Sequence, residues 1–499
     1  MSRSDNLVFG ALALLGISFW FLLGFPFANH NESFAIVPHV QQMSFIDALT
    51  TQIYPVANYR PLGQGALWIG YHFFGQSIYA VELFNFVVAL LAWLLLFVAM
   101  RERRVFSATA LVAGGMLFAG YIYLFHFHGV FYSPLLLLFS LLFWFDARPF
   151  TRGRFVAVSL YALVATLFHP YALLVYFAGV IGIALERRKM LAREWPMIAL
   201  SLIVTIVLIA VLVIIPRHES VLTGSEMLQG FIASYRMVEI NTVVSVAALV
   251  LTIATAASLP GKTLIHVTAA VVAGIIGMAA FWTGIPVLLV WIVVCLVKAA
   301  LLKKWWIVFV LAGSSLFPAP AATGSPTYAI FALLMCAAIL PYGWTTMEQR
   351  WSTVARPIAL TTVCVAAVIL CLLRAGLSIP VVSPIVRPLL AEKEKTFQME
   401  AIVAWMTSSE YATATPMLVR EQVNPKDADD SIKRNHRPPT SQEYLNLYLR
   451  SKRPPVPADG TTRRAIWIGF GGETMPPGPL ILTLTAPNAG EARVVLETP

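Results

Sequence analysis

The chain has 499 residues, of which 58% are hydrophobic and only 12% charged, and its formal net charge is +10. Soluble globular proteins carry about 25% charged residues, so this composition excludes a protein whose surface lies mostly in water. The basic residues form short clusters between apolar runs, a pattern typical of membrane topology signals and not of a nucleic-acid interface. We therefore expect an all-α polytopic membrane protein with no nucleic-acid partner.

Hydropathy predicts about thirteen spanning helices within residues 1–374, because runs near 20 apolar residues cross a hydrocarbon core of about 30 Å as helices. The first is expected to be retained, since no small-residue cleavage site follows it. The predicted spans cover about 7–25, 78–100, 105–124, 130–146, 154–168, 171–186, 196–215, 242–258, 263–282, 285–301, 305–317, 327–343 and 357–373.

The Lys and Arg residues predict the orientation of these spans. Connections on one side hold clusters such as 101–104 and 187–193, whereas the other side holds only Arg60, Arg217 and Arg236. Because basic loops stay inside, we expect a cytoplasmic N-terminus, with a bacterial plasma membrane as the fitting location. Tyr132, near the outer end of a span, is expected to join an interfacial aromatic belt.

Residues 375–499 change in composition and are predicted to form a small extracytoplasmic α/β domain. The stretch 392–411 has the pattern of an amphipathic helix, and 464–473 and 478–497 alternate as strands do. An odd number of preceding spans places this domain outside the membrane.

The outward side carries two polar connections much longer than a helix hairpin needs. The first follows the opening span, contains the segments "FIDALTTQI" and "GALWIGYHFF", and is predicted to lay amphipathic helices along the membrane surface. The second covers 216–241. This side is therefore the predicted location of a functional site.

Three motifs in this arrangement resemble a known family. "NESFA" (31–35), "NYRPLGQGALWIGYHFFG" (58–75) and, more faintly, "GSPTYAIFALLM" (324–335) are similar to motifs of GT-C-fold glycosyltransferases, which include protein mannosyltransferases and aminoarabinose transferases. The resemblance covers about the first 100 residues. It implies a GT-C-like fold, a polyprenyl-phosphate-linked sugar donor, and roles for Asn31 and Tyr328 in substrate binding. The family's leading Asp is Asn31 here, which removes the usual first carboxylate.

Glycosyl transfer needs a base for the acceptor hydroxyl and cations for the departing phosphate. Glu32 is the predicted catalytic base, and Asp47 is the alternative candidate for that role. Solvent exposure on an amphipathic helix would also explain an aspartate at position 47. Arg60 is the predicted phosphate ligand, because a guanidinium binds oxyanions through two donors. Lipid-headgroup snorkelling is the alternative explanation for Arg60.

Further polar residues on the same side are predicted to line the site. Glu82 begins a span, where an ionisable group is expected to face the protein interior. Carboxylates and imidazoles together can bind a divalent metal, but no close ligand spacing supports one, so no cofactor is expected. The predicted substrate-binding residues are Asn31, Arg60, Glu82, His126, His128, His169, Arg217, Arg236 and Tyr328.

The expected function is transfer of a sugar from a polyprenyl-phosphate carrier to an extracytoplasmic glycan, lipid or protein acceptor, with membrane lipid as the surrounding partner. A transporter or flippase for a lipid-linked saccharide is one alternative, and a membrane acyltransferase or a non-catalytic envelope scaffold is the other. A transporter predicts charges buried within the spans. The predicted spans are almost free of charge; His266 and Lys298 are the exceptions, and Lys298 can snorkel towards the cytoplasm.

Overall fold

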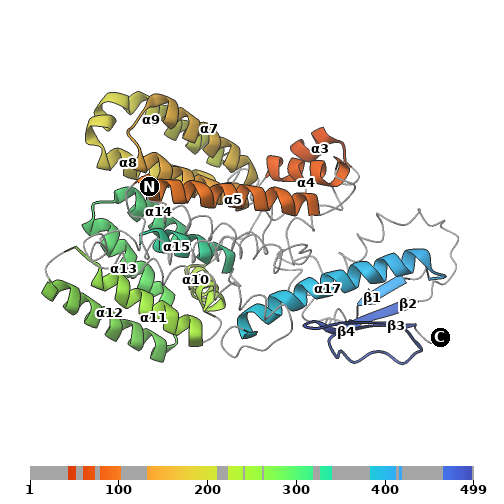
Figure 1. Ribbon diagram of the computed structural model, residues 1–499. Helices are drawn as coiled ribbons and strands as arrows, with labels where there is room; N and C mark the ends of the chain where they lie inside the picture. The colour runs from red at the N-terminus through yellow and green to blue at the C-terminus, as the bar shows by residue number, and fades with distance from the viewer. Residues whose placement is uncertain are drawn as a thin grey trace, which may run out of the picture.

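The computed structural model describes residues 43–51, 60–73, 79–102, 132–210, 223–239, 242–260, 263–317, 326–339, 383–411, 415–418 and 465–496. These residues are mostly helical, with a small sheet near the C-terminus (Figure 1). The helices before the sheet are α3 (Phe45–Thr50), α4 (Pro61–Phe73), α5 (Tyr79–Glu102), the helix Tyr132–Ala147, α7 (Arg152–Phe168), α8 (Tyr171–Glu186), α9 (Arg188–Ile209), α10 (Gly224–Val238), α11 (Thr242–Ala257), α12 (Thr263–Thr283), α13 (Val287–Leu301), α14 (Trp305–Ser315), α15 (Pro326–Ile339) and α17 (Ser383–Ser408).

Contacts between helix ends define two ends of this group of helices. At one end, which we call the Arg187 end, Lys304 before α14 reaches Asp146 and Glu186, at 3.4 and 3.3 Å. At the other end, the Arg60 end, Tyr235 of α10 donates a hydrogen bond to the Ser315 carbonyl at 3.0 Å. Burial raises the pKa of the Tyr235 phenol well above its ordinary value, so the hydroxyl keeps its proton and this bond.

Small residues allow α8 and α14 to pack closely. A β-carbon on Gly182 would lie only 2.0 Å from the Cα of Trp306, so the two backbones touch where this glycine sits. The buried side chains around this crossing, including Trp306 and Ile183, belong to one continuous apolar core. Only glycine permits this approach.

The outer surface of these helices is also apolar. Along α12, Leu264, Ile275 and Trp282 are 77%, 65% and 80% exposed, and α9 presents an exposed apolar stripe through Leu200 and Ile203. Contiguous exposed apolar area of this kind marks a surface that contacts lipid or another protein.

Among the described residues, one helical segment has both the length and the hydropathy to cross a membrane. It is Leu264–Thr283, with 20 residues and a mean hydropathy of 2.2. Other apolar helices, such as Tyr171–Glu186 and Val287–Leu301, are shorter. The thirteen predicted spans are therefore not shown, because most of the described apolar helices are below spanning length and several predicted segments lie outside the described residues.

The α/β character predicted for the C-terminal region is confirmed. The strands β1 (Thr415–Leu418), β2 (Ala465–Phe470), β3 (Leu480–Ala486) and β4 (Gly490–Leu496) form a sheet in the order β1-β2-β4-β3. β1 pairs parallel to β2, and the other pairs are antiparallel. Ile466 and Ile468 share one face because strand side chains alternate, and they pack with Ile402 and Met406 of α17. Figure 1 shows α17 and the sheet apart from α11–α13.

Candidate functional site

Arg60 lies at the start of α4 and is buried, with 5% of its surface exposed. Pro61 occupies the first helical position, where its missing N–H costs nothing, and the Arg60 carbonyl accepts the bond from the Gln64 N–H at 3.1 Å. The α4 helix packs against α3, α5 and α7. This guanidinium is therefore held inside the protein, and its burial argues against the headgroup-snorkelling explanation for Arg60.

Tyr132 brings Arg60 and His169 together. The Arg60 guanidinium carbon lies 5.9 Å from the centre of the Tyr132 ring, within the range of a cation–π interaction. The Tyr132 and His169 rings are 4.6 Å apart, and both side chains are 1% exposed. We call these three residues the Arg60 cluster. It contains two of the residues predicted for substrate binding, supplied by segments more than 100 positions apart in the chain.

The His169 ring is oriented by the backbone N–H of Tyr171. His169 ends α7, and its Nδ1 accepts a hydrogen bond from the Tyr171 N–H at 3.2 Å. In the neutral ring the proton is then on Nε2, which is the donor. This arrangement suits a hydrogen-bonding role for Nε2.

Aromatic rings surround the Arg60 cluster. Phe331 of α15 lies 6.1 Å from Tyr132, and Tyr171 stacks on Phe317 with ring centres 4.5 Å apart. The backbone of Tyr328 lies one turn before Phe331 on α15, while its side chain is outside the described part. The burial of Arg60 places its guanidinium in a medium of lower dielectric constant than water, which strengthens its interaction with an anion.

Asp47 is exposed and occupied in a local structural role. Its carboxylate accepts from the Ser44 hydroxyl at 2.7 Å, and the Ser44 Oγ accepts from the Asp47 N–H at 3.1 Å. The same carboxylate also accepts from the Ser44 backbone N–H at 3.4 Å, which completes a capping box at the start of α3. The arrangement favours the helix explanation for Asp47 over a catalytic one.

Arg236 also has a structural partner. Its Nε and Nη2 donate to the Gly284 carbonyl at 3.1 and 2.8 Å, and Gly284 has a φ of +72° in the turn between α12 and α13. Glu239, at the end of α10, accepts from the Leu288 N–H at 3.3 Å. Together these side chains attach α10 to the turn between α12 and α13. Two of the guanidinium nitrogens of Arg236 already donate to a backbone carbonyl.

The remaining predicted residues are not placed by their side chains. Glu82 is in α5, but its side chain is outside the described part. Among the side chains that are described, no group of three or more His, Cys, Asp or Glu is close enough to hold a metal. The predicted residues outside the described ranges are Asn31, Glu32, His126, His128 and Arg217.

Lys298 does not reach the surface of the protein. This side chain is completely buried, and its ammonium donates to the Ser258 hydroxyl at 2.7 Å. Lys298 is in the last turn of α13, and Ser258 directly follows α11. A cation there is favoured by the helix dipoles, so its burial has a structural explanation that requires no transported substrate.

Sequence reasoning missed the role of Tyr132. It lies at the predicted outer end of a span, where aromatic residues commonly contact lipid headgroups, but its ring is buried and contacts both Arg60 and His169. No local signal distinguishes the two environments, because the partners come from α4 and from the end of α7. No family model, curated protein or solved structure matches the chain.

Proposed function

We propose that this chain is an integral membrane glycosyltransferase that moves a sugar from a polyprenyl-phosphate carrier to an extracytoplasmic acceptor. The observation that carries the proposal is the Arg60 cluster, in which a buried guanidinium and an oriented imidazole meet on one tyrosine ring. A buried guanidinium suits an anion such as a lipid phosphate, and Nε2 of His169 suits a hydrogen bond to that phosphate or to the sugar.

The surroundings also support a substrate tethered to lipid. The Arg60 cluster lies at the end of the helices opposite Arg148, Arg187 and Lys304, and the large exposed side chains of α12, such as Leu264, Ile275 and Trp282, are apolar. In a bilayer, a chain of this kind keeps its basic end in the cytoplasm and its other end outside. A lipid-linked sugar presents its phosphate at that outer boundary.

The proposed reaction begins with attack of an acceptor hydroxyl on the anomeric carbon. The new glycosidic C–O bond forms as the bond between the sugar and the phosphate oxygen breaks, and polyprenyl phosphate leaves with the electron pair. Glu32 is the proposed base that takes the hydroxyl proton. Arg60 is the proposed counter-charge for the phosphate as it departs. No metal is required by this assignment.

The test uses purified full-length protein, radiolabelled polyprenyl-phosphate sugar and an extract that contains acceptors. We expect transfer by the wild type, a loss of at least about 100-fold for Glu32→Gln, and a loss of about 10- to 100-fold for Arg60→Ala. Arg193→Gln, an exposed change at the Arg187 end, is the control and should transfer normally. Equal transfer by all four proteins would remove the site assignment.

A further inference from the structure

The two outer strands of the C-terminal sheet differ in how well they are protected against further pairing. The strand order β1-β2-β4-β3 makes β1 and β3 the edges. β1 has only four residues and includes Pro416, and both shortness and proline are features that block strand addition. β3 is longer, and its sequence LILTLTA contains neither proline nor a charged residue. β3 is therefore the less protected edge.

Two hydrogen bonds show which residues of β4 bond to which neighbour. The Glu491 carbonyl accepts from the Gly471 N–H at 2.9 Å, on the β2 side, and the Leu496 N–H donates to the Pro479 carbonyl at 3.1 Å, on the β3 side. Successive residues of a strand turn their N–H and C=O groups to opposite sides. The even-numbered residues of β4 therefore bond to β3, and the odd-numbered ones bond to β2.

The same alternation shows which backbone groups of β3 point outward. Ala492 of β4 pairs with Leu484, so Leu484 turns its N–H and carbonyl towards β4. Its neighbours Thr483 and Thr485 turn theirs away from β4, and their side chains are exposed. Neither threonine has a hydrogen-bond partner on that side among the described residues. The edge thus presents two donors and two acceptors to an added strand.

The helix α17 covers one face of the sheet as far as this edge. Gln398 donates to the carbonyls of Leu484 and Gly490, at 3.0 and 2.8 Å, and Leu482 packs partly buried against the same core. If two copies of β3 paired antiparallel, both copies of α17 would lie on one face of the joined sheet. Strands lie about 4.8 Å apart, whereas helix axes need about 8–10 Å. A strand that brings no helix therefore fits this edge better than a second copy of the chain.

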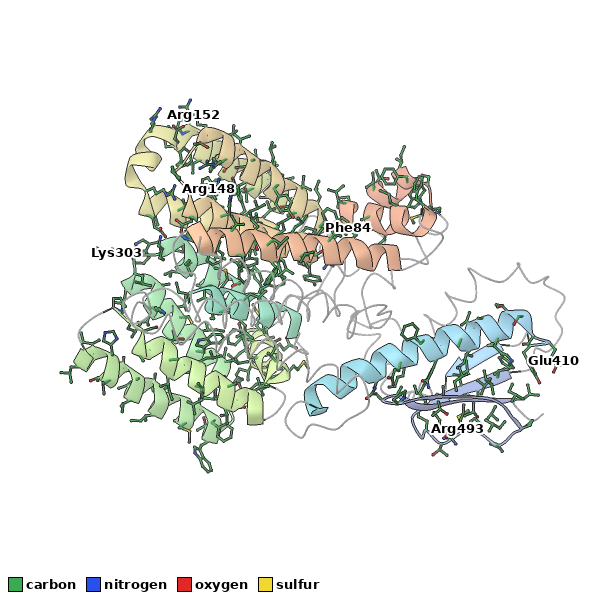
Figure 2. All side chains as sticks on the ribbon, in the orientation of Figure 1. Phe84, Arg148, Arg152, Lys303, Glu410 and Arg493 are labelled. Atoms are coloured by element: carbon green, nitrogen blue, oxygen red, sulfur yellow. The ribbon has the colours of Figure 1, made fainter. Side chains whose placement is uncertain are left out.

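The side chains of β3 indicate what sequence such a strand would have. Thr483 lies opposite Arg493 of β4, which is labelled in Figure 2, and Thr485 lies opposite Glu491. These two charges are of opposite sign, and β3 itself carries none, so the edge has no net charge to attract an ionic partner. Cross-strand neighbours of leucine and threonine are best matched by apolar and β-branched or small polar residues. The edge therefore favours an uncharged segment in which these two kinds alternate.

We propose that the β3 edge binds an extended, uncharged segment of another polypeptide, which adds to the four-stranded sheet as an outer strand. The backbone groups of Thr483 and Thr485 provide the affinity, and the alternation of leucine and threonine selects the side chains of the partner. This inference concerns the C-terminal sheet alone. It depends neither on the Arg60 cluster nor on sugar transfer.

The test measures binding of a fluorescently labelled peptide to the full-length protein in detergent. The peptide alternates threonine and valine and has a lysine at each end for solubility. We expect a saturable rise in fluorescence anisotropy, and binding at least about tenfold weaker for the same peptide methylated at its backbone nitrogens. At saturating peptide, the amides of Thr483 and Thr485 should exchange more slowly with solvent, whereas the Leu484 amide should change little because it already bonds to β4.

Substitutions at Thr483 test the same contact from the side of the protein. Thr483→Pro removes an outward N–H without removing a bond to β4, and should weaken peptide binding about tenfold or more. Thr483→Val is the matched control, because it loses only the hydroxyl and keeps the N–H, and it should bind as the wild type does. If the Pro variant does not fold, amide exchange in the wild-type protein tests the contact instead.

Several results would overturn the proposal. They are absence of peptide binding, equal binding of the methylated peptide, equal binding by a folded Pro variant, and unchanged exchange at both threonine amides. Self-association of the full-length protein that is lost in Thr483→Pro would also overturn it, because the occupant would then be a second copy. Since sugar transfer is measured separately, failure here leaves the transferase proposal standing.

Discussion

The guanidinium carbon of Arg60 lies 5.9 Å from the centre of the Tyr132 ring, and both side chains are buried. This contact joins the start of α4 to the helix Tyr132–Ala147. It places a positive charge inside the protein at the end where the proposed donor phosphate arrives.

Substitutions at Tyr132 test whether the ring positions Arg60 and His169. Tyr132→Phe keeps the aromatic face that contacts both neighbours, so we expect transfer within about threefold of the wild type. Tyr132→Leu removes the aromatic ring that contacts Arg60 and His169, and we expect a loss of about tenfold or more in kcat/KM for the donor. Steady-state transfer assays measure both, and equal activity of the Leu and Phe variants would show that the ring has no positioning role.

Gly182 provides a test of the closest helix crossing. We expect Gly182→Ala to destabilise the protein by about 1–3 kcal/mol or more, because the new methyl group would overlap the backbone of Trp306. Gly313→Ala on α14 is the control. Nothing lies within 4 Å of a β-carbon there, so the change should be neutral or stabilise the helix by up to about 1 kcal/mol. Thermal unfolding in detergent compares them, and equal melting temperatures would contradict the described packing of α8 on α14.

Substitutions at Arg236 test whether this residue stabilises the fold or binds the donor phosphate. Because its fork is engaged by the Gly284 carbonyl, we expect Arg236→Ala to lower the melting temperature by a few degrees and to leave the donor KM within about twofold. Arg236→Lys keeps the charge but loses one of the paired donors, and should show part of the same loss of stability. A normal melting temperature with a raised KM would instead identify Arg236 as a ligand of the donor.

Glu394 is predicted to hold α17 onto the sheet. Its buried carboxylate accepts from the Asn488 N–H at 2.6 Å, the Asn488 amide nitrogen at 2.7 Å and the Ala489 N–H at 2.9 Å. Glu394→Ala leaves buried donors without an acceptor, at about 1–3 kcal/mol each. Hydrogen exchange on the full-length protein should show faster exchange at Asn488 and Ala489. Glu410→Ala, at an exposed residue labelled in Figure 2, should leave the exchange of both amides unchanged. Slow exchange at Asn488 and Ala489 in both variants would refute the role of Glu394.

Much of the helical pattern is readable from the sequence. The predicted segment 171–186 matches α8, because Pro170 and the basic residues after Glu186 mark its ends. The predicted segment 196–215 differs from α9, which begins earlier at Arg188. The charged residues at 187–193 favour a connection by hydropathy, but long charged side chains also have good helix propensity. The strand β1 was missed, since four residues are too few to show alternation.

The candidate site is less accessible to sequence reasoning. Arg60 was identified because an arginine is rare on the outward side, and His169 because it lies at a short outward turn. Their meeting on Tyr132 depends on how α4, α7 and the helix Tyr132–Ala147 pack together, which no local pattern records. The buried contact between Lys298 and Ser258 was missed for the same reason, since it joins the ends of α13 and α11.

The most direct measurement follows both products of the reaction in sealed vesicles that contain purified protein, a polyprenyl-phosphate donor labelled in its sugar, and acceptor. We predict that free polyprenyl phosphate and labelled acceptor appear in equal amounts in wild-type vesicles and in neither Glu32→Gln nor Arg60→Ala vesicles. Movement of intact labelled donor from one leaflet to the other, with its sugar still attached, would contradict the account and identify a transporter.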